Sequence, residues 1–332
     1  MSDMFEMIAG LGSQFRWAAD LDVPAVPQAE SILVCGMGGS AISGDLAAAA
    51  VPSAFVAVNK GYSLPGWAAA VRPTVLAVSY SGNTEETRSA VDEALALRLP
   101  VSIVAGGGAL GDLADREDLP LIRVPGGLQP RAAVGYLTGS VMRVLESAGL
   151  AERQREGLNE AAEVVAELWG EGAAGPAGRL AEDLAEGLAG RIPVIYGSSG
   201  PTAAVAQRWK TQINENAKRP AFWSLLPELD HNEIVGWSAL EALTRRSVGI
   251  VALRDRDEHP QVKRRFALTA DLIASRVPVI GEAWSQGESV IARLAALILI
   301  GDILSVRLAE QEGVDPMPVD VIEHLKALLN EE

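Results

Sequence analysis

Two short segments rich in glycine and hydroxyl side chains constrain this chain most, because each separates an apolar run from a helical pattern. The first is Cys-Gly-Met-Gly-Gly-Ser at 35–40, and the second is Ser-Tyr-Ser-Gly-Asn-Thr-Glu-Glu-Thr at 79–87. The apolar runs before them, at 31–34 and 74–78, are typical of buried parallel strands. A strand, a turn of small residues and a helix place backbone N–H groups and hydroxyls at a helix N-terminus, where an anion is stabilised. We therefore expect the two turns to converge on one phosphate group.

Short apolar runs alternate with helical patterns along most of the chain, which predicts parallel sheets covered by helices on both faces. We expect strands at 31–34, 54–58, 74–78, 101–104, 121–124, 193–196, 247–253 and 277–280. We expect helices at 1–20, 41–50, 85–96, 110–115, 133–148, 202–217, 286–312 and 319–329, and a helical stretch at 151–188 that is broken near 170–178.

The second half of the chain looks like a degenerate copy of the first. The turn Gly-Ser-Ser-Gly at 197–200 follows an expected strand in the same way as the glycine-rich turn at 36–40. The predicted fold class is therefore α/β, with two subdomains that are each a parallel sheet flanked by helices. We place them at 1–150 and 151–332, and we expect the ligand cleft between them at the carboxyl ends of the strands.

The charge of the chain limits its partners. Its 332 residues carry a formal net charge of −15, which argues against nucleic acid and against an anionic membrane surface. The apolar stretch at 294–300 is far too short to span a bilayer. A phosphate ligand must therefore be held by local backbone dipoles and a few cations.

The cysteine and histidine content limits redox and metal chemistry. Cys35 is the single cysteine, so no internal disulfide can form, and a reducing, cytoplasmic location without a signal peptide is expected. With only three histidines as well, we expect no metal centre built from Cys and His, while a carboxylate-held magnesium ion is left open.

In the first segment, Gly38 and Gly39 would let the backbone turn tightly and approach a ligand, and Ser40 would add a hydroxyl at the start of a helix. The ordinary alternative is a strand-to-helix turn with a serine cap. The spacing is not that of a dinucleotide-binding fingerprint.

In the second segment, Ser79, Ser81 and Thr84 place three hydroxyls just before the helix expected from Glu85. These hydroxyls suit a phosphate, and the same stretch could also form a capping box with a glutamate of the helix. The segment lacks the lysine of a P-loop, so nucleotide hydrolysis is not predicted.

Several segments together resemble the bifunctional phosphoglucose/phosphomannose isomerases of the sugar isomerase (SIS) domain superfamily. They are Gly-Met-Gly-Gly-Ser at 36–40, the serine-rich segment at 79–87, Pro-Arg-Ala-Ala at 130–133, Asn-Glu-Asn-Ala-Lys at 214–218, Glu-Leu-Asp-His-Asn-Glu at 228–233, Gly-Val-Asp-Pro at 313–316 and Leu-Lys at 325–326. They run in family order over nearly the whole chain. The resemblance implies two SIS-type subdomains and a cofactor-free aldose–ketose isomerase acting on sugar phosphates.

The resemblance also implies a role for each candidate residue. The two loops would hold the phosphate of glucose 6-phosphate, and of mannose 6-phosphate, during interconversion with fructose 6-phosphate. Glu215 would be the catalytic base that moves a proton between C2 and C1 through a cis-enediol, and Arg131 would stabilise the enediolate. His231 and Lys326 would open the sugar ring. By the same resemblance, His231 would be supplied by the neighbouring subunit of a homodimer.

From the residues alone, other interpretations stay open. Glu215 could be a solvated helix end, His231 a structural histidine and Lys326 a surface lysine. The family places a hydroxyl residue shortly before the terminal lysine, where this chain has Val319 and Val321, so activity on the C2 epimer is left open. Rival functions are a non-catalytic sugar-phosphate sensor and an amino-sugar phosphate isomerase.

Overall fold

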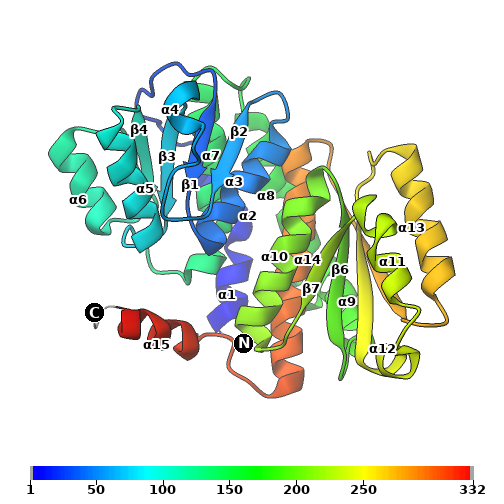
Figure 1. Ribbon diagram of the computed structural model, residues 1–332. Helices are drawn as coiled ribbons and strands as arrows, with labels where there is room; N and C mark the ends of the chain where they lie inside the picture. The colour runs from blue at the N-terminus through cyan, green and yellow to red at the C-terminus, as the bar shows by residue number, and fades with distance from the viewer. Residues whose placement is uncertain (1–2, 330–332) are drawn as a thin grey trace.

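Two parallel sheets, one in each half of the chain, organise the computed structural model, which describes residues 3–329 (Figure 1). Sheet A has the strand order β2-β1-β3-β4-β5, and sheet B has the order β7-β6-β8-β9. The strands are β1 (Ile32–Cys35), β2 (Val56–Asn59), β3 (Thr74–Ser79), β4 (Val101–Ala105), β5 (Leu121–Arg123), β6 (Ile192–Ser198), β7 (Phe222–Leu226), β8 (Val248–Arg254) and β9 (Val279–Trp284). The predicted fold class is confirmed.

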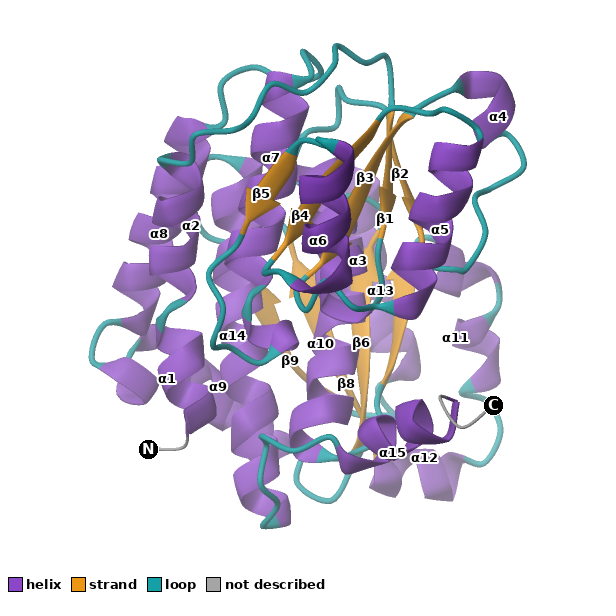
Figure 2. Ribbon diagram, turned by 90° about the vertical axis from the view of Figure 1, so that its left-hand side faces the viewer, coloured by secondary structure: helices purple, strands orange, loops and turns teal. Residues whose placement is uncertain are grey.

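Helices connect the strands and cover both sheets (Figure 2). Those of the first half are α1 (Asp3–Ala9), α2 (Leu11–Ala19), α3 (Gly38–Ala50), α4 (Ala68–Val71), α5 (Glu85–Ala96), α6 (Gly108–Glu117), the short 3-10 helix η1 (Pro130–Ala132) and α7 (Val134–Ser147). Those of the second half are α8 (Arg155–Trp169), η2 (Gly172–Ala174), α9 (Pro176–Gly187), α10 (Pro201–Ala217), η3 (Glu228–His231), α11 (Glu233–Gly236), α12 (Glu241–Ser247), α13 (Pro260–Ile273), α14 (Val290–Glu312) and α15 (Asp320–Leu329).

The residues of β1 show why sheet A needs helices on both faces. Ile32 and Val34 pack into one apolar cluster with α3 and α7, whereas Leu33 and Cys35 pack into another with α5 and α6. All four side chains are buried, as expected where successive residues of a strand point to opposite, covered faces.

Sheet B is covered in the same way. One face packs against α10 and α14, while the other face packs against α13. A single apolar cluster includes side chains of α2, α3, α7, α8, α9, α10 and α14, so both sheets share the helical layer between them.

The subdomain boundary between residues 150 and 151 stays a prediction. Within residues 3–329, no helix is both long and apolar enough to cross a membrane.

Some expected elements differ from the structure. The helix expected at 1–20, whose first two residues lie outside those described, is divided at Gly10 into α1 and α2. Glycine weakens a helix interior, which favours such a break. Strand β7 was not expected. Among the described strands it pairs only with β6, so it is an edge strand. Phe222 at its start is 58% exposed, which hides the pattern of a buried strand.

Candidate active site

The first glycine-rich turn lies against the segment that carries Arg131. Gly38 has a φ of +51°, and a Cβ at Gly39 would stand 3.2 Å from the carbonyl oxygen of Pro130. Helix α3 already begins at Gly38, so Ser40 lies in its first turn and the alternative of a serine cap is wrong. The Oγ of Ser40 instead accepts a hydrogen bond from the backbone N–H of Tyr80 over 3.3 Å.

The second turn contains a chain of hydroxyl groups. The Oγ of Ser79 lies 2.9 Å from Oγ1 of Thr84 and accepts from the N–H of Gly82, while Oγ of Ser81 accepts from the N–H of Asn83. The alternative of a capping box is wrong here, because the side chain of Thr84 bonds to Ser79 and does not cap α5. Ser79 is fully buried, whereas Ser81 and Thr84 line a cavity of about 230 Å³.

The two turns are adjacent in space because β1 and β3 pair directly. Both turns follow the carboxyl ends of their strands, so they share the edge of sheet A where the strands end. The hydrogen bond between Ser40 and Tyr80 joins them there. The two turns therefore lie side by side, and their shared binding of one phosphate group stays a prediction.

Arg131 is buried between the two halves of the molecule, with 5% of its side chain exposed. Its Nε donates to Oδ1 of Asn216 over 2.7 Å, and its Nη2 donates to the carbonyl oxygens of Pro316 and Met317 over 2.7 and 2.9 Å. Its Nη1 donates to Oε1 of Gln129 over 3.3 Å. Burial lowers the pKa of Arg131.

Glu215 brings the second half of the chain to Arg131. It lies in the last turn of α10, 31% of its side chain is exposed, and its Oε2 is 3.6 Å from Nη1 of Arg131. The Glu215 carboxylate opposes the effect of burial on the Arg131 pKa. The structure therefore places a carboxylate and a buried guanidinium side by side, near the carboxyl edge of sheet A.

Lys326 approaches the second turn from the C-terminal helix. Together with Tyr62, Ser81, Thr84 and other residues of the turn, it lines the cavity of about 230 Å³. Helix α15, which carries this lysine, has no buried side chain and extends along the outside of the molecule (Figure 1). A cation thus faces the hydroxyl groups of Ser81 and Thr84.

His231 does not join this group of residues within one chain. It is exposed, and it follows β7 at the carboxyl edge of sheet B. Helix α10 follows β6 and runs back, so Glu215 lies at the opposite edge, just before β7 begins. The expectation that both sheets point their carboxyl ends at the cleft is therefore wrong: at Glu215, sheet B contributes its amino edge.

Two further residues of the site were not chosen from the sequence. Asn216 is 1% exposed and its Nδ2 donates to Oγ of Ser305 over 2.8 Å, while Lys218 donates to the carbonyl oxygen of Glu215. Both belong to the Asn-Glu-Asn-Ala-Lys segment at 214–218. The motif therefore pointed to this segment, but no pattern in it indicated which of its side chains would be buried.

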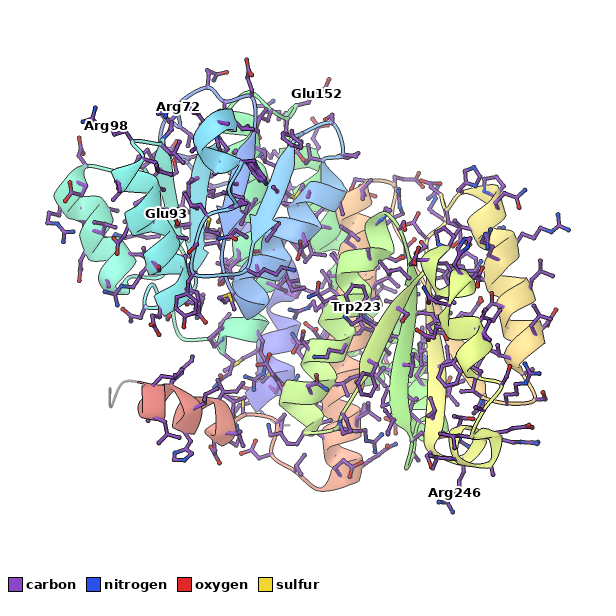
Figure 3. The ribbon with its side chains drawn as sticks, in the orientation of Figure 1. Arg72, Glu93, Arg98, Glu152, Trp223 and Arg246 are labelled. Carbon is purple, nitrogen blue, oxygen red and sulfur yellow. The ribbon has the colours of Figure 1, made fainter. Side chains whose placement is uncertain are left out.

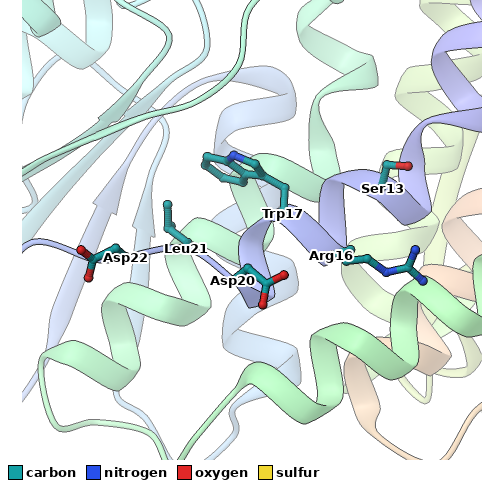
Figure 4. Close-up of a pocket in the computed structure, with 6 residues that line it drawn as sticks. All are labelled: Ser13, Arg16, Trp17, Asp20, Leu21 and Asp22. Carbon is teal, nitrogen blue, oxygen red and sulfur yellow. The ribbon is translucent and has the colours of Figure 1, made fainter.

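A separate hollow of about 470 Å³ lies along the end of α2 (Figure 4). Its charged lining residues are Arg16, Asp20 and Asp22, and Asp20 is paired with Arg155. This hollow contains none of the predicted site residues.

The chain is similar to known proteins in both sequence and fold. Residues 178–329 match the family model of the bacterial phospho-glucose isomerase C-terminal SIS domain. The chain is 36% identical to a bifunctional phosphoglucose/phosphomannose isomerase of Caldicellulosiruptor bescii over 99% of both chains, and 34% identical to one of Aquifex aeolicus over 98% of both. Its fold is similar to the C-terminal domain of glucosamine-fructose-6-phosphate aminotransferase from Francisella tularensis, with a TM-score of 0.71 at 14% identity, covering 94% of this chain and 97% of that one.

Proposed function

Because the chain belongs to the bifunctional phosphoglucose/phosphomannose isomerase family and is therefore an isomerase, we propose that it interconverts glucose 6-phosphate and fructose 6-phosphate. We extend the proposal to mannose 6-phosphate, the C2 epimer of the same aldose. The observation that carries it is the pairing of Glu215 with buried Arg131 beside two hydroxyl-rich turns. The proposed reaction needs no cofactor.

The two turns would bind the phosphate group. Ser40 and Ser81 each use their oxygen to accept a backbone hydrogen bond, which leaves their hydroxyl hydrogens available to donate. Ser79 is buried and pairs with Thr84, so it would orient the Thr84 hydroxyl toward the phosphate. The backbone N–H groups at the start of α3, at Gly38 and Gly39, would add donors.

Glu215 would carry the proton between C2 and C1 of the open-chain sugar. A single carboxylate can take the proton from one carbon and return it to the next, with a cis-enediol between the two steps. Arg131 would stabilise the negative charge that develops on the enediolate oxygen. Support comes from the partial exposure of Glu215, which leaves its carboxylate accessible beside an otherwise buried cation.

His231 and Lys326 would open the sugar ring, with His231 contributed by the partner subunit of a homodimer. Support for the partner's role comes from topology, because His231 and Glu215 of one chain lie at opposite edges of sheet B. A two-fold partner can bring the carboxyl edge of its sheet B to the Glu215 site.

The first rival, a non-catalytic sugar-phosphate sensor, gives no reason to hold a partly exposed carboxylate against Arg131. The second, an amino-sugar phosphate isomerase, would use the same fold on a different substrate. Both rivals would bind a sugar phosphate, so only the reaction products distinguish them from our proposal.

The deciding experiment offers fructose 6-phosphate to the purified protein in buffer with EDTA and measures glucose 6-phosphate and mannose 6-phosphate by coupled assays. We expect both products. Glucose 6-phosphate alone would restrict the proposal to the one epimer and would point to Val319 and Val321. Binding of fructose 6-phosphate with neither product would refute the proposal and leave the sensor or an amino-sugar substrate.

A further inference from the structure

Lys218 ends helix α10 in a backbone conformation that lysine rarely adopts. Its φ is 54°, in the left-handed region, at a position where glycine is the preferred residue. A side chain with a Cβ carries an energetic cost there, and such residues often persist where the side chain is needed. The side chain of Lys218 therefore requires a structural or functional reason.

The ammonium group of Lys218 joins two parts of the site. Its Nζ donates to the backbone oxygen of Glu215 over 2.6 Å and to the backbone oxygen of Pro316 over 3.3 Å. Nη2 of Arg131 donates to the same Pro316 oxygen over 2.7 Å. One carbonyl thus bridges two cations, although burial and the charge of Arg131 both lower the pKa of Lys218.

The segment that these cations hold leads directly to the C-terminal helix. Pro316 and Met317 both accept hydrogen bonds from Arg131, and α15 begins soon afterwards at Asp320. Lys326, which faces the second hydroxyl-rich turn, lies on that helix. A constraint at Pro316 is therefore also a constraint on where Lys326 stands.

We propose that Lys218 is a positioning residue of this active site, which fixes the backbone of Glu215 and the segment around Pro316 relative to Arg131. The proposal rests on the proposed function, and it gives Lys218 no contact with the substrate. Its effect is transmitted through Glu215 on one side and through Pro316 and Lys326 on the other.

Arg98 provides a matched control. It follows helix α5 with the same φ of 54°, and Figure 3 shows it at the outer end of the N-terminal half, away from α10. Its backbone oxygen accepts from Arg72, a bond that a glycine would keep. Arg98→Gly therefore removes the same backbone cost as Lys218→Gly without touching the site.

The experiment compares wild type, Lys218→Gly, Lys218→Arg and Arg98→Gly by Tm and by kcat and KM for fructose 6-phosphate. Relief of the left-handed strain should leave the Tm of Arg98→Gly unchanged or higher. In Lys218→Gly the same relief is offset by loss of the two hydrogen bonds from Nζ, so its Tm should not exceed that of Arg98→Gly. Loss of charged hydrogen bonds should lower kcat about tenfold or more in Lys218→Gly alone, with KM nearly unchanged. Lys218→Arg should recover part of kcat. A wild-type kcat in Lys218→Gly, or an equal loss in Arg98→Gly, would overturn the proposal.

A second measurement does not depend on turnover. Hydrogen exchange of the peptide 314–320 should be about tenfold faster in Lys218→Gly than in wild type, and unchanged in Arg98→Gly. Unchanged exchange in Lys218→Gly would refute the positioning role. If the wild-type protein formed no product, the proposed function would fail, and hydrogen exchange alone would decide whether Lys218 holds this segment.

Discussion

Arg131 lies 3.6 Å from the carboxylate of Glu215 while all three of its guanidinium nitrogens donate hydrogen bonds to other residues. Its bonds to Asn216, Pro316 and Met317 are short, whereas its approach to Glu215 is the longest of these contacts. In the proposed mechanism, the enediolate oxygen would therefore most easily contact Nη1 of Arg131, where it would displace the Glu215 carboxylate. In that mechanism, this geometry would couple proton transfer by Glu215 to charge stabilisation by Arg131.

Replacing Glu215 by glutamine should remove the base and preserve the fold. We expect turnover of fructose 6-phosphate to fall on the order of 100-fold or more, with binding of the sugar phosphate retained. Calorimetric binding and steady-state kinetics measure the two effects separately. Glu163→Gln, at an exposed position of α8, serves as the control. Turnover within a few-fold of wild type in Glu215→Gln would show that another group is the base.

Mixing two inactive variants tests whether His231 acts across a subunit interface. A mixed dimer of Glu215→Gln and His231→Ala contains one site with both native residues, so we expect partial activity to return after subunit exchange. Mass spectrometry of the intact dimers confirms the exchange. If mixed dimers form and stay inactive, His231 acts within its own chain or not at all.

Replacing Thr84 by valine should weaken phosphate binding without removing the catalytic groups. The change keeps the shape of the side chain and deletes the hydroxyl that lies 2.9 Å from Ser79. Loss of one hydrogen bond to a charged phosphate predicts a KM about tenfold higher or more, with kcat largely preserved. Thr244→Val, on α12 of the other half, is the matched control. An unchanged KM would place the phosphate elsewhere.

Burial raises the pKa of the Cys35 thiol from 9.0 to about 12, and a hydrogen bond from Asn59 acts in the opposite direction. In the unfolded chain the thiol loses its proton first, so the free energy of unfolding should fall as the pH rises from about 9 toward about 12. The Cys35→Ala variant should show a smaller fall over this range in denaturant titrations. At pH 8 the folded protein should resist alkylation at Cys35 until denaturant is added. Rapid labelling of the native protein would contradict this prediction.

Local patterns in the sequence predicted much of the fold. The strand at Thr74–Ser79 and the helix at Glu85–Ala96 follow directly from a buried apolar run and from an amphipathic pattern opened by two glutamates. Strand β7 was not predicted because an edge strand with an exposed Phe222 lacks the composition of a buried strand. Short-range patterns thus identify elements best where burial is complete.

The candidate site was only partly predictable. The motifs identified Arg131 and Glu215, but their pairing depends on how α10 packs between the sheets, which no local pattern encodes. The same packing turns the amino edge of sheet B toward Arg131, and periodicity cannot reveal the relative orientation of two sheets. Lys218 was overlooked because its importance lies in a backbone angle and two carbonyl contacts.

Helix α10 has 17 residues, a length of about 25 Å at 1.5 Å per residue. Glu215 stands near one end of this helix, and the turn at its other end lies at the same edge of sheet B as His231. In a two-fold assembly, the span of this single helix would set the spacing between the two reaction centres. Each subunit would then contribute Glu215 to one reaction centre and His231 to the other, from opposite edges of its sheet B.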